Sequence, residues 1–219
     1  LLKNNNFVKV KSVFSHLAAS DDLQLDDFTK LQFQRFDAMY SELERVLPTK
    51  PIRHILNTSG IFNYAEKQME MVRLGIGLYG IGNSEQELKV LENVSTLKTI
   101  ISQIREVSAE ESIGYSRRFR VTQKMKVATI PIGYADGWTR DLQGFEVLVD
   151  GQRCEIVGRV SMDQITIKLP KSYPLGTVVT LIGSNGSDDI SATDLAEKRG
   201  TINYEVLCLI SDRVPRKYR

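Results

Sequence analysis

The spacing of the apolar residues changes near residue 83, and this change constrains the fold more than any other feature of the chain. Over residues 1–82, short runs typical of strands alternate with runs in which apolar residues recur at helical spacing. After a polar stretch at 83–87, apolar and polar residues alternate, and turn-forming residues separate the runs. The sequence therefore predicts two domains, one of strands and helices over 1–82 and one made mostly of β-strands over 83–219.

The first domain is predicted to contain strand, helix, strand, helix and strand in that order. The strands are expected at 7–14, 52–56 and 71–80, and the long first helix is expected to end before Pro48. This order is typical of parallel strands joined by helical crossovers. Because a closed barrel of this kind needs about eight strands, we expect the final portion of a (β/α)8 barrel whose beginning precedes Leu1. The helix is predicted from Phe28, Leu31, Phe36, Met39, Leu43 and Val46.

Polar residues gather where each predicted strand ends. His16 follows the first strand, Thr58 follows the second, and Arg73 lies in the third with Gly75 and Gly77 after it. Ligands of parallel α/β folds bind at the carboxyl ends of the strands. A buried charge needs a partner, and glycines let backbone N–H groups approach an anion. These residues predict a site for a small ligand that carries an acceptor atom and a phosphate.

Each of these residues also has a purely structural interpretation. Arg73 can reach the surface while the glycines only form a turn. His16 and His54 can be packed, hydrogen-bonded residues without chemistry. The tyrosines of the second domain can be core or turn aromatics.

The second domain is predicted to be mostly antiparallel. Asp150-Gly151 lies between two alternating runs and indicates a tight hairpin. Ser191 with Asp194 three residues later predicts the capping box of a helix whose residues 195–196 face inward. Strands are expected over 97–107, 125–132, 145–149, 154–160, 164–169 and 177–182.

The composition excludes several classes of partner. With 29 Lys and Arg against 27 Asp and Glu, the formal charge of +2 is too even to favour nucleic acid. No apolar run approaches the length that spans a membrane, and no signal peptide is visible. Cys154 and Cys208 form no metal or disulfide framework, which favours a cytoplasmic protein.

Eight segments, taken together, resemble the alanine racemase family, and they follow the family order from one end of the chain to the other. They are Phe14-Ser15-His16-Leu17-Ala18, His54-Ile55-Leu56-Asn57-Thr58-Ser59, Val72-Arg73-Leu74-Gly75-Ile76, Gly114-Tyr115-Ser116, Ile132-Gly133-Tyr134-Ala135-Asp136-Gly137, Gly158-Arg159-Val160-Ser161-Met162-Asp163-Gln164, Ile202-Asn203-Tyr204-Glu205 and Arg213-Val214-Pro215-Arg216. The resemblance implies a fold type III enzyme that uses pyridoxal 5'-phosphate, with a barrel followed by a β domain. It also implies a homodimer with active sites shared across the interface, which interconverts L- and D-alanine for peptidoglycan.

The resemblance assigns six residues to the cofactor. Arg73 would hold the pyridine nitrogen, and as a permanent cation it would keep that nitrogen unprotonated. The ring is then a weaker electron sink, which favours proton exchange at Cα over decarboxylation. The other five are Gly75 and Ile76, whose N–H groups would bind the phosphate, Thr58 and Tyr204, whose hydroxyls would do the same, and His16, which would flank the ring.

Three further residues are assigned to the substrate. Tyr115 would be one of the two acid/base groups, and it would reach the active site of the other subunit. Met162 would meet the substrate carboxylate through its backbone N–H, and Tyr134 would line the way in.

The lysine that forms the Schiff base in the family lies near the start of the barrel and has no counterpart here, so we expect the chain alone to be inactive. Segments 15–22 and 57–61 resemble the family branch that is fused to a muramoyl-peptide ligase. Two alternatives stay open: a non-catalytic module for cofactor binding or dimerisation, and an amino-acid decarboxylase of the same fold. Arg73 speaks against the decarboxylase, because decarboxylation needs a protonated ring.

Overall fold

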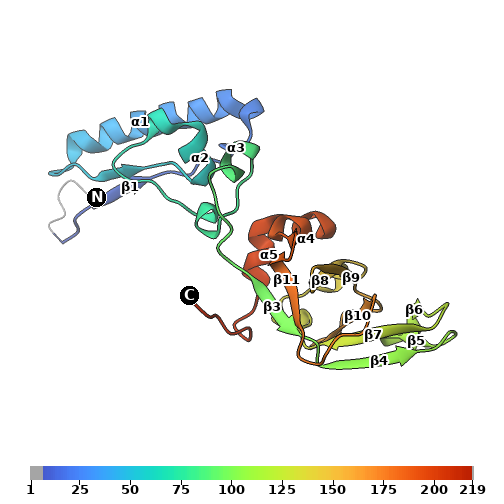
Figure 1. Ribbon diagram of the computed structural model, residues 1–219. Helices are drawn as coiled ribbons and strands as arrows, with labels where there is room; N and C mark the ends of the chain where they lie inside the picture. The colour runs from blue at the N-terminus through green and yellow to red at the C-terminus, as the bar shows by residue number, and fades with distance from the viewer. Residues whose placement is uncertain (1–6, 219) are drawn as a thin grey trace. The chain divides into compact units, whose positions relative to one another are not determined.

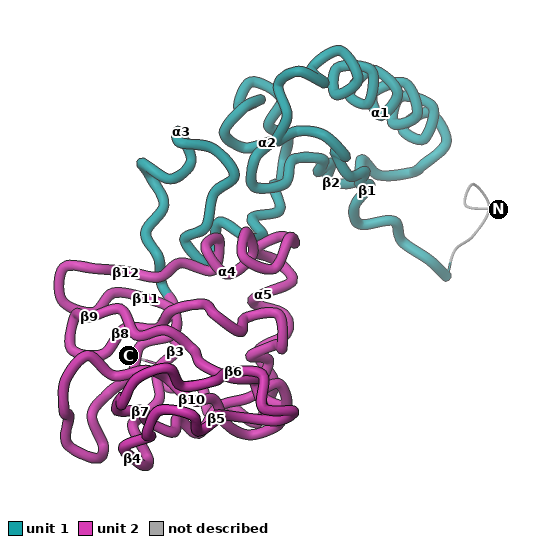
Figure 2. The backbone as a smooth tube through the Cα atoms, turned by 90° about the vertical axis from the view of Figure 1, so that its right-hand side faces the viewer, with its two compact units in different colours: residues 1–94 teal, residues 95–219 magenta. Residues whose placement is uncertain are grey.

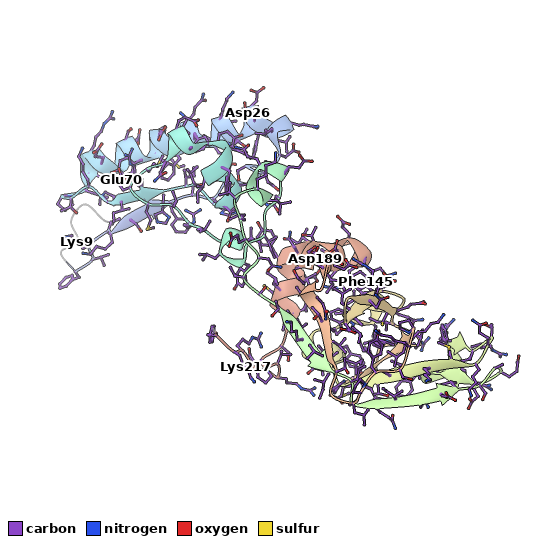
Figure 3. All side chains as sticks on the ribbon, viewed as in Figure 1. Lys9, Asp26, Glu70, Phe145, Asp189 and Lys217 are labelled. Carbon is purple, nitrogen blue, oxygen red and sulfur yellow. The ribbon has the colours of Figure 1, made fainter. Side chains whose placement is uncertain are left out.

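The computed structural model describes residues 7–218 of the chain, whose order of elements is drawn in Figure 1. The chain divides into two compact units, unit 1 over residues 1–94 and unit 2 over residues 95–219, coloured separately in Figure 2. Figure 3 draws the side chains of the described residues on the ribbon. Among the described residues, no helix is both long enough and apolar enough to cross a membrane.

Unit 1 is built on two parallel strands and one long helix. Strand β1 (Ser12–Phe14) pairs in parallel with β2 (Ile52–His54), and α1 (Asp26–Val46) connects them. The predicted strand–helix–strand order and the parallel pairing are confirmed, although both strands are shorter than expected. The other elements of unit 1 from residue 7 onward are the short helices α2 (Thr58–Asn63) and α3 (Glu85–Leu88) and the 3₁₀ turns Leu23–Leu25, Ala65–Lys67 and Ile76–Tyr79.

Helix α1 packs on the core of unit 1 through a stripe that differs from the one the sequence suggested. Thr29, Phe33, Phe36 and Tyr40 are buried, and they recur at the spacing of one helical face. Of the six apolar residues that predicted the helix, only Phe36 is buried. Phe33 and Phe36 of α1 pack in one core cluster with Leu17, Ile55, Leu56 and Tyr64.

The prediction of a strand over residues 71–80 is wrong. Two backbone hydrogen bonds, from the N–H groups of Met71 and Arg73, still run to β2 and the residues after it. At Gly75 the backbone leaves the extended region, with φ of −104° and ψ of −101°, and the 3₁₀ turn Ile76–Tyr79 follows. The apolar alternation therefore extends into a tight turn. The prediction failed because a pattern of side chains does not show whether the backbone keeps its hydrogen-bonding partner in the sheet.

The described residues of unit 2 form three antiparallel sheets. In the largest, the order is β12-β11-β8-β9, and β3 also pairs with β11; the second has the order β10-β7-β4, and the third is the hairpin β5-β6. The strands are β3 (Leu97–Ile100), β4 (Gln103–Val107), β5 (Ser112–Ile113), β6 (Phe119–Arg120), β7 (Met125–Ile130), β8 (Glu146–Val149), β9 (Gln152–Glu155), β10 (Ile165–Leu169), β11 (Val178–Asn185) and β12 (Asp188–Ile190). Two helices follow, α4 (Ala192–Arg199) and α5 (Asn203–Leu209), and 3₁₀ turns lie at Tyr115–Arg117, Tyr134–Asp136 and Arg140–Leu142.

Two predicted strands of unit 2 are interrupted. The run 97–107 forms two strands, because the chain passes from one sheet to another at the fully buried Ile101. The N–H of Ile101 donates to Thr177 O at 2.9 Å, and the next N–H, that of Ser102, donates to Thr129 O at 3.0 Å. The run 154–160 is strand only as far as Glu155, after which a single bridge continues the pairing.

Both short-range predictions for unit 2, the hairpin turn and the capping box, are confirmed. Asp150 and Gly151 have φ of 50° and 73° between the antiparallel strands β8 and β9, as a two-residue type I′ turn requires. Ser191 Oγ accepts from the N–H of Asp194 at 3.1 Å, and Asp194 Oδ2 accepts from the N–H of Ser191 at 2.7 Å. Leu195 and Ala196 are buried, as predicted.

Candidate active site

The guanidinium of Arg73 lies at the carboxyl ends of β1 and β2. Its Nη1 donates to His54 O at 3.0 Å, and its Nη2 donates to Ser15 O at 2.8 Å and to Ile55 O at 3.3 Å. These acceptors are neutral carbonyls, and no carboxylate among the described residues forms an ion pair with Arg73. Burial lowers the pKa of Arg73 from its ordinary value, yet an arginine side chain stays protonated in proteins. The site therefore keeps an uncompensated positive charge.

His54 is a partner of this cation that the sequence did not assign. Its Nδ1 lies 2.8 Å from Arg73 Nη1, and because arginine has no acceptor, Nδ1 accepts and the ring proton is on Nε2. Burial, and then the charge of Arg73, lower the pKa of His54, which favours the neutral ring that this contact requires. Phe14 stacks on the imidazole with 5.3 Å between centroids and 8° between planes, and Arg73 lies 5.3 Å from the Phe14 centroid. A buried arginine needs partners, and a histidine at the end of the neighbouring strand was the available signal.

His16 lies at the exposed edge of the same cluster. Its Nδ1 is 3.4 Å from Arg73 Nη2, so the structure brings these two predicted residues together. Gln32 on α1 fixes the loop, donating from Nε2 to His16 O and accepting at Oε1 from the N–H of Ala18, both at 3.0 Å. Since the Nη protons of Arg73 already face these groups, its Nε–H is a donor without an acceptor among the described residues.

Thr58 connects α2 to the glycine turn. Its Oγ1 accepts from the N–H of Gly75 at 3.1 Å and from the N–H of Gly77 at 3.2 Å. A hydroxyl has two acceptor lone pairs and one proton, so the Thr58 hydroxyl can only donate to a further partner. Gly75, expected to offer its N–H to a phosphate, thus has a protein acceptor here, whereas the N–H of Ile76 has none among the described residues.

Three groups at this site have no acceptor among the described residues, and all three are donors: the Nε–H of Arg73, the hydroxyl of Thr58 and the N–H of Ile76. A ligand that offers only acceptors, such as a ring nitrogen and phosphate oxygens, complements this set. Pyridoxal phosphate carries both of these groups, so the residues present fit it.

In unit 2, two loops that carry predicted residues are joined through their backbones. The N–H of Tyr134 donates to Ser161 O, and the N–H of Ala135 donates to Met162 O, both at 3.0 Å. A Cβ at Gly133 would come within 2.3 Å of Met162 O, so only glycine permits this approach. The side chains of Tyr134 and Met162 are both exposed.

An ion-pair network supports these loops, and sequence analysis missed it. Arg213 Nη2 lies 2.7 Å from Asp163 Oδ1, and Arg213 Nε lies 3.5 Å from Asp136 Oδ1. Asp136 Oδ2 also accepts from the N–H of Gly133 at 2.9 Å. The carboxylates of Asp163 and Asp136 raise the pKa of Arg213. Asp136, Asp163 and Arg213 all lie in segments that resemble the family, but residue type alone did not show that these three side chains meet.

The two remaining predicted tyrosines are on separate elements of unit 2. Tyr115 begins the 3₁₀ turn between β5 and β6, and its side chain is 70% exposed. Tyr204 is in the first turn of α5 and is 41% exposed.

Two family models match the chain. One is described as alanine racemase, N-terminal domain, and matches residues 1–83; the other is alanine racemase, C-terminal domain, and matches residues 94–218. The chain belongs to the alanine racemase family.

Named relatives and solved structures of alanine racemases agree with this assignment. An alanine racemase of Streptococcus mutans is 50% identical over 212 residues, which is 95% of this chain and 56% of that protein. The structure of alanine racemase from Bacillus anthracis with bound L-Ala-P is 40% identical with a TM-score of 0.88, over 95% of this chain and 55% of that one. That of Bartonella henselae, with covalently bound pyridoxal phosphate, is 30% identical with a TM-score of 0.81, over 97% and 57%.

These similarities show the alanine racemase fold in this chain. They also show that the chain spans about 56% of the length of the curated relatives that it matches.

Proposed function

We propose that this chain is the C-terminal part of an alanine racemase that uses pyridoxal 5'-phosphate. The observation that carries the proposal is the environment of Arg73, a cation held by backbone carbonyls and by the neutral His54. Such a cation can donate a hydrogen bond to an unprotonated ring nitrogen, whereas it would repel a protonated one. An acidic partner at this position would favour the decarboxylase alternative, and the described residues contain none.

The residues of unit 1 would bind and orient the cofactor. Arg73 would donate to the ring nitrogen, and His16 would flank the ring. The phosphate would be bound by the hydroxyl of Thr58 and by the N–H groups of Gly75 and Ile76, with Gly75 shared with Thr58 Oγ1. The family resemblance adds the hydroxyl of Tyr204, a residue of unit 2, as a further ligand of the phosphate. When bound, the cofactor supplies an electron-withdrawing ring that acidifies the Cα–H of its amino acid.

The residues of unit 2 would act on the amino acid. Tyr115 would take or deliver the Cα proton at its phenol oxygen, as a general acid or base. Met162 would bind the substrate carboxylate through its N–H, which has no acceptor among the described residues, and Tyr134 would line the way in. The substrate would be alanine; the related Bacillus anthracis enzyme is named with bound L-Ala-P.

The family resemblance supports the remaining parts of the proposal. Residues 1–82 would form the final portion of the (β/α)8 barrel, and residues 83–219 the β domain. The enzyme would be a cytoplasmic homodimer in which Tyr115 serves the active site of the partner subunit, and D-alanine would enter peptidoglycan. The cofactor-bearing lysine would lie in the portion of the relatives that this chain does not cover, so the chain by itself would not racemise alanine.

A graft tests the proposal. This chain would replace the matching 212 residues of the Streptococcus mutans relative, and D-alanine formation from L-alanine would be followed by chiral chromatography. The graft is expected to racemise alanine, and Tyr115→Phe is expected to reduce kcat by about 10²–10⁴-fold because it removes an acid/base group.

The 219-residue chain with pyridoxal phosphate and L-alanine is the matched comparison, and it is expected to form no D-alanine above the free-cofactor background. A graft that binds the cofactor but does not racemise alanine would contradict the proposal. Racemisation by the chain alone would contradict the assignment of the lysine.

A further inference from the structure

The turn that carries Tyr115 has a strained backbone. It connects β5 to β6, and the two residues after Tyr115, Ser116 and Arg117, have φ of 58° and 50°. The left-handed region is unfavourable for residues with a Cβ and is readily adopted by glycine. Backbone strain of this kind persists only where surrounding groups determine it, and it clusters at functional sites.

Two side-chain hydrogen bonds hold this turn. Arg117 Nε donates to Ser112 Oγ at 3.0 Å, within the same hairpin. Arg159 Nη1 donates to Ser116 Oγ at 3.2 Å, from a segment 43 residues further along the chain. Only the second bond connects the strained residue to a part of the unit outside the hairpin.

The segment that carries Arg159 is fixed against the turn. Gly158 has φ of 75°, and a Cβ there would come within 2.9 Å of Ile113 O. A Cβ at Gly114 would likewise come within 3.0 Å of the backbone N of Arg159. The two backbones therefore meet at glycines, and the Arg159 side chain starts from a defined position beside Ser116.

The ring of Tyr115 has little other support. It is 70% exposed, and its hydroxyl has no hydrogen bond to a described residue. The backbone of the turn fixes the Cα–Cβ bond from which the ring projects, so the place of the phenol depends on that backbone.

We propose that Arg159 is a positioning residue for Tyr115 and acts through Ser116. The inference rests on the proposed function, in which the phenol must meet the Cα proton. A misplacement of about 1 Å at such a group costs roughly 100-fold in rate.

Backbone ¹⁵N relaxation on the 219-residue chain tests the positioning itself. The order parameter of the Tyr115 amide is expected to be about 0.85 in the parent and to fall below about 0.6 in Arg159→Ala and in Ser116→Gly. Ser116→Gly also removes the left-handed strain, so its Tm is expected to rise while the order falls. If the bond had a merely structural role, Ser116→Gly would lower the Tm, and the Tm and the order parameter would not change in opposite directions.

The grafted enzyme tests the consequence for catalysis. Arg159→Ala and Ser116→Gly are expected to lower kcat by about 10–100-fold, with KM for L-alanine changed less than about twofold. Arg159→Lys keeps a donor and is expected to recover most of kcat. Arg118→Ala is the matched control, because Arg118 carries the same charge in the same turn and bonds to no described residue.

Unchanged order parameters and unchanged kcat in both Arg159→Ala and Ser116→Gly would overturn the inference. So would parallel losses of Tm and kcat in Ser116→Gly. If the parent graft is inactive, the proposed function fails, and the relaxation measurement alone decides whether Arg159 positions Tyr115.

Discussion

Arg73 Nη1 lies 2.8 Å from His54 Nδ1, and this contact requires His54 to be the acceptor. A protonated imidazole would present an N–H to the guanidinium at this position, so the arrangement exists only while His54 is neutral. The histidine thus links the orientation of Arg73 to pH.

The stability of unit 1 is expected to fall as the pH is lowered below about 6.5, the ordinary pKa of histidine. Burial and the charge of Arg73 place the pKa of His54 below that value in the folded state. Across the interval between the two pKa values the unfolded chain binds more protons, so the stability rises with pH and is lost as pH falls. Thermal unfolding between pH 7.5 and 5 measures this.

His54→Gln provides the control for this pH dependence. The Gln amide oxygen can still accept from Arg73 but does not titrate, so the decline below pH 6.5 is expected to shrink. His16, the other histidine of the chain, is present in both proteins, and the difference between them reports on His54. Equal slopes in the two proteins would contradict this account of the pair.

The sequence predicted the polar residues at the strand ends of unit 1 because parallel strands present their carboxyl ends together. It did not predict that the segment 71–80 leaves the strand conformation. That departure depends on Thr58, whose Oγ1 accepts the N–H groups of Gly75 and Gly77. A side-chain acceptor from another segment of the chain thus takes the place of a strand partner for these N–H groups. The apolar pattern of residues 71–80 does not reveal this acceptor.

In unit 2, predictions that rest on neighbouring residues were more reliable than predictions of long strands. The turn at Asp150-Gly151 and the capping box at Ser191 need only neighbouring residues, so the sequence contains all of their causes. The passage between sheets at Ile101 depends on Thr177 and Thr129, which the alternation of residues 97–107 cannot reveal.

Thr58→Val is expected to destabilise unit 1 by about 1–3 kcal/mol, because the buried N–H of Gly77 loses its acceptor. Valine has nearly the same shape, so the loss reports the hydroxyl and not a cavity. Thr58→Ser keeps both hydrogen bonds and is the matched control, with a smaller expected loss of roughly 1 kcal/mol for the missing methyl group. Urea denaturation measures both, and equal losses would show that the hydroxyl is not the cause.

Gly133→Ala is expected to separate the loops that carry Tyr134 and Met162. Its Cβ would come within 2.3 Å of two backbone oxygens, those of Met162 and Ser161, which cannot move independently of their loop. We expect a loss of about 1–3 kcal/mol, typical of overpacking, together with changed amide chemical shifts in both loops. Gly144→Ala is the comparison, because its Cβ meets nothing within 4 Å and only its φ of 75° is unfavourable. Shifts that stay local to residue 133 would count against the backbone link.

Asp136 and Arg213 belong to the same ion-pair network, but Asp136 is expected to contribute more to stability than Arg213. Asp136→Ala removes both the ion pair with Arg213 and the acceptor of the Gly133 N–H, and we expect a loss of about 1–3 kcal/mol for the unpaired donor. Arg213→Ala removes only ion pairs of an exposed guanidinium, which salt and water screen, so its Tm is expected to fall less. The effect of Arg213→Ala is also expected to shrink as ionic strength rises, whereas that of Asp136→Ala should largely remain, because a hydrogen bond to a backbone N–H does not depend on a distant charge. Thermal unfolding of both variants at low and high salt measures this order, and a larger loss for Arg213→Ala would show that the ion pair, and not the turn-closing hydrogen bond, holds the Tyr134 loop.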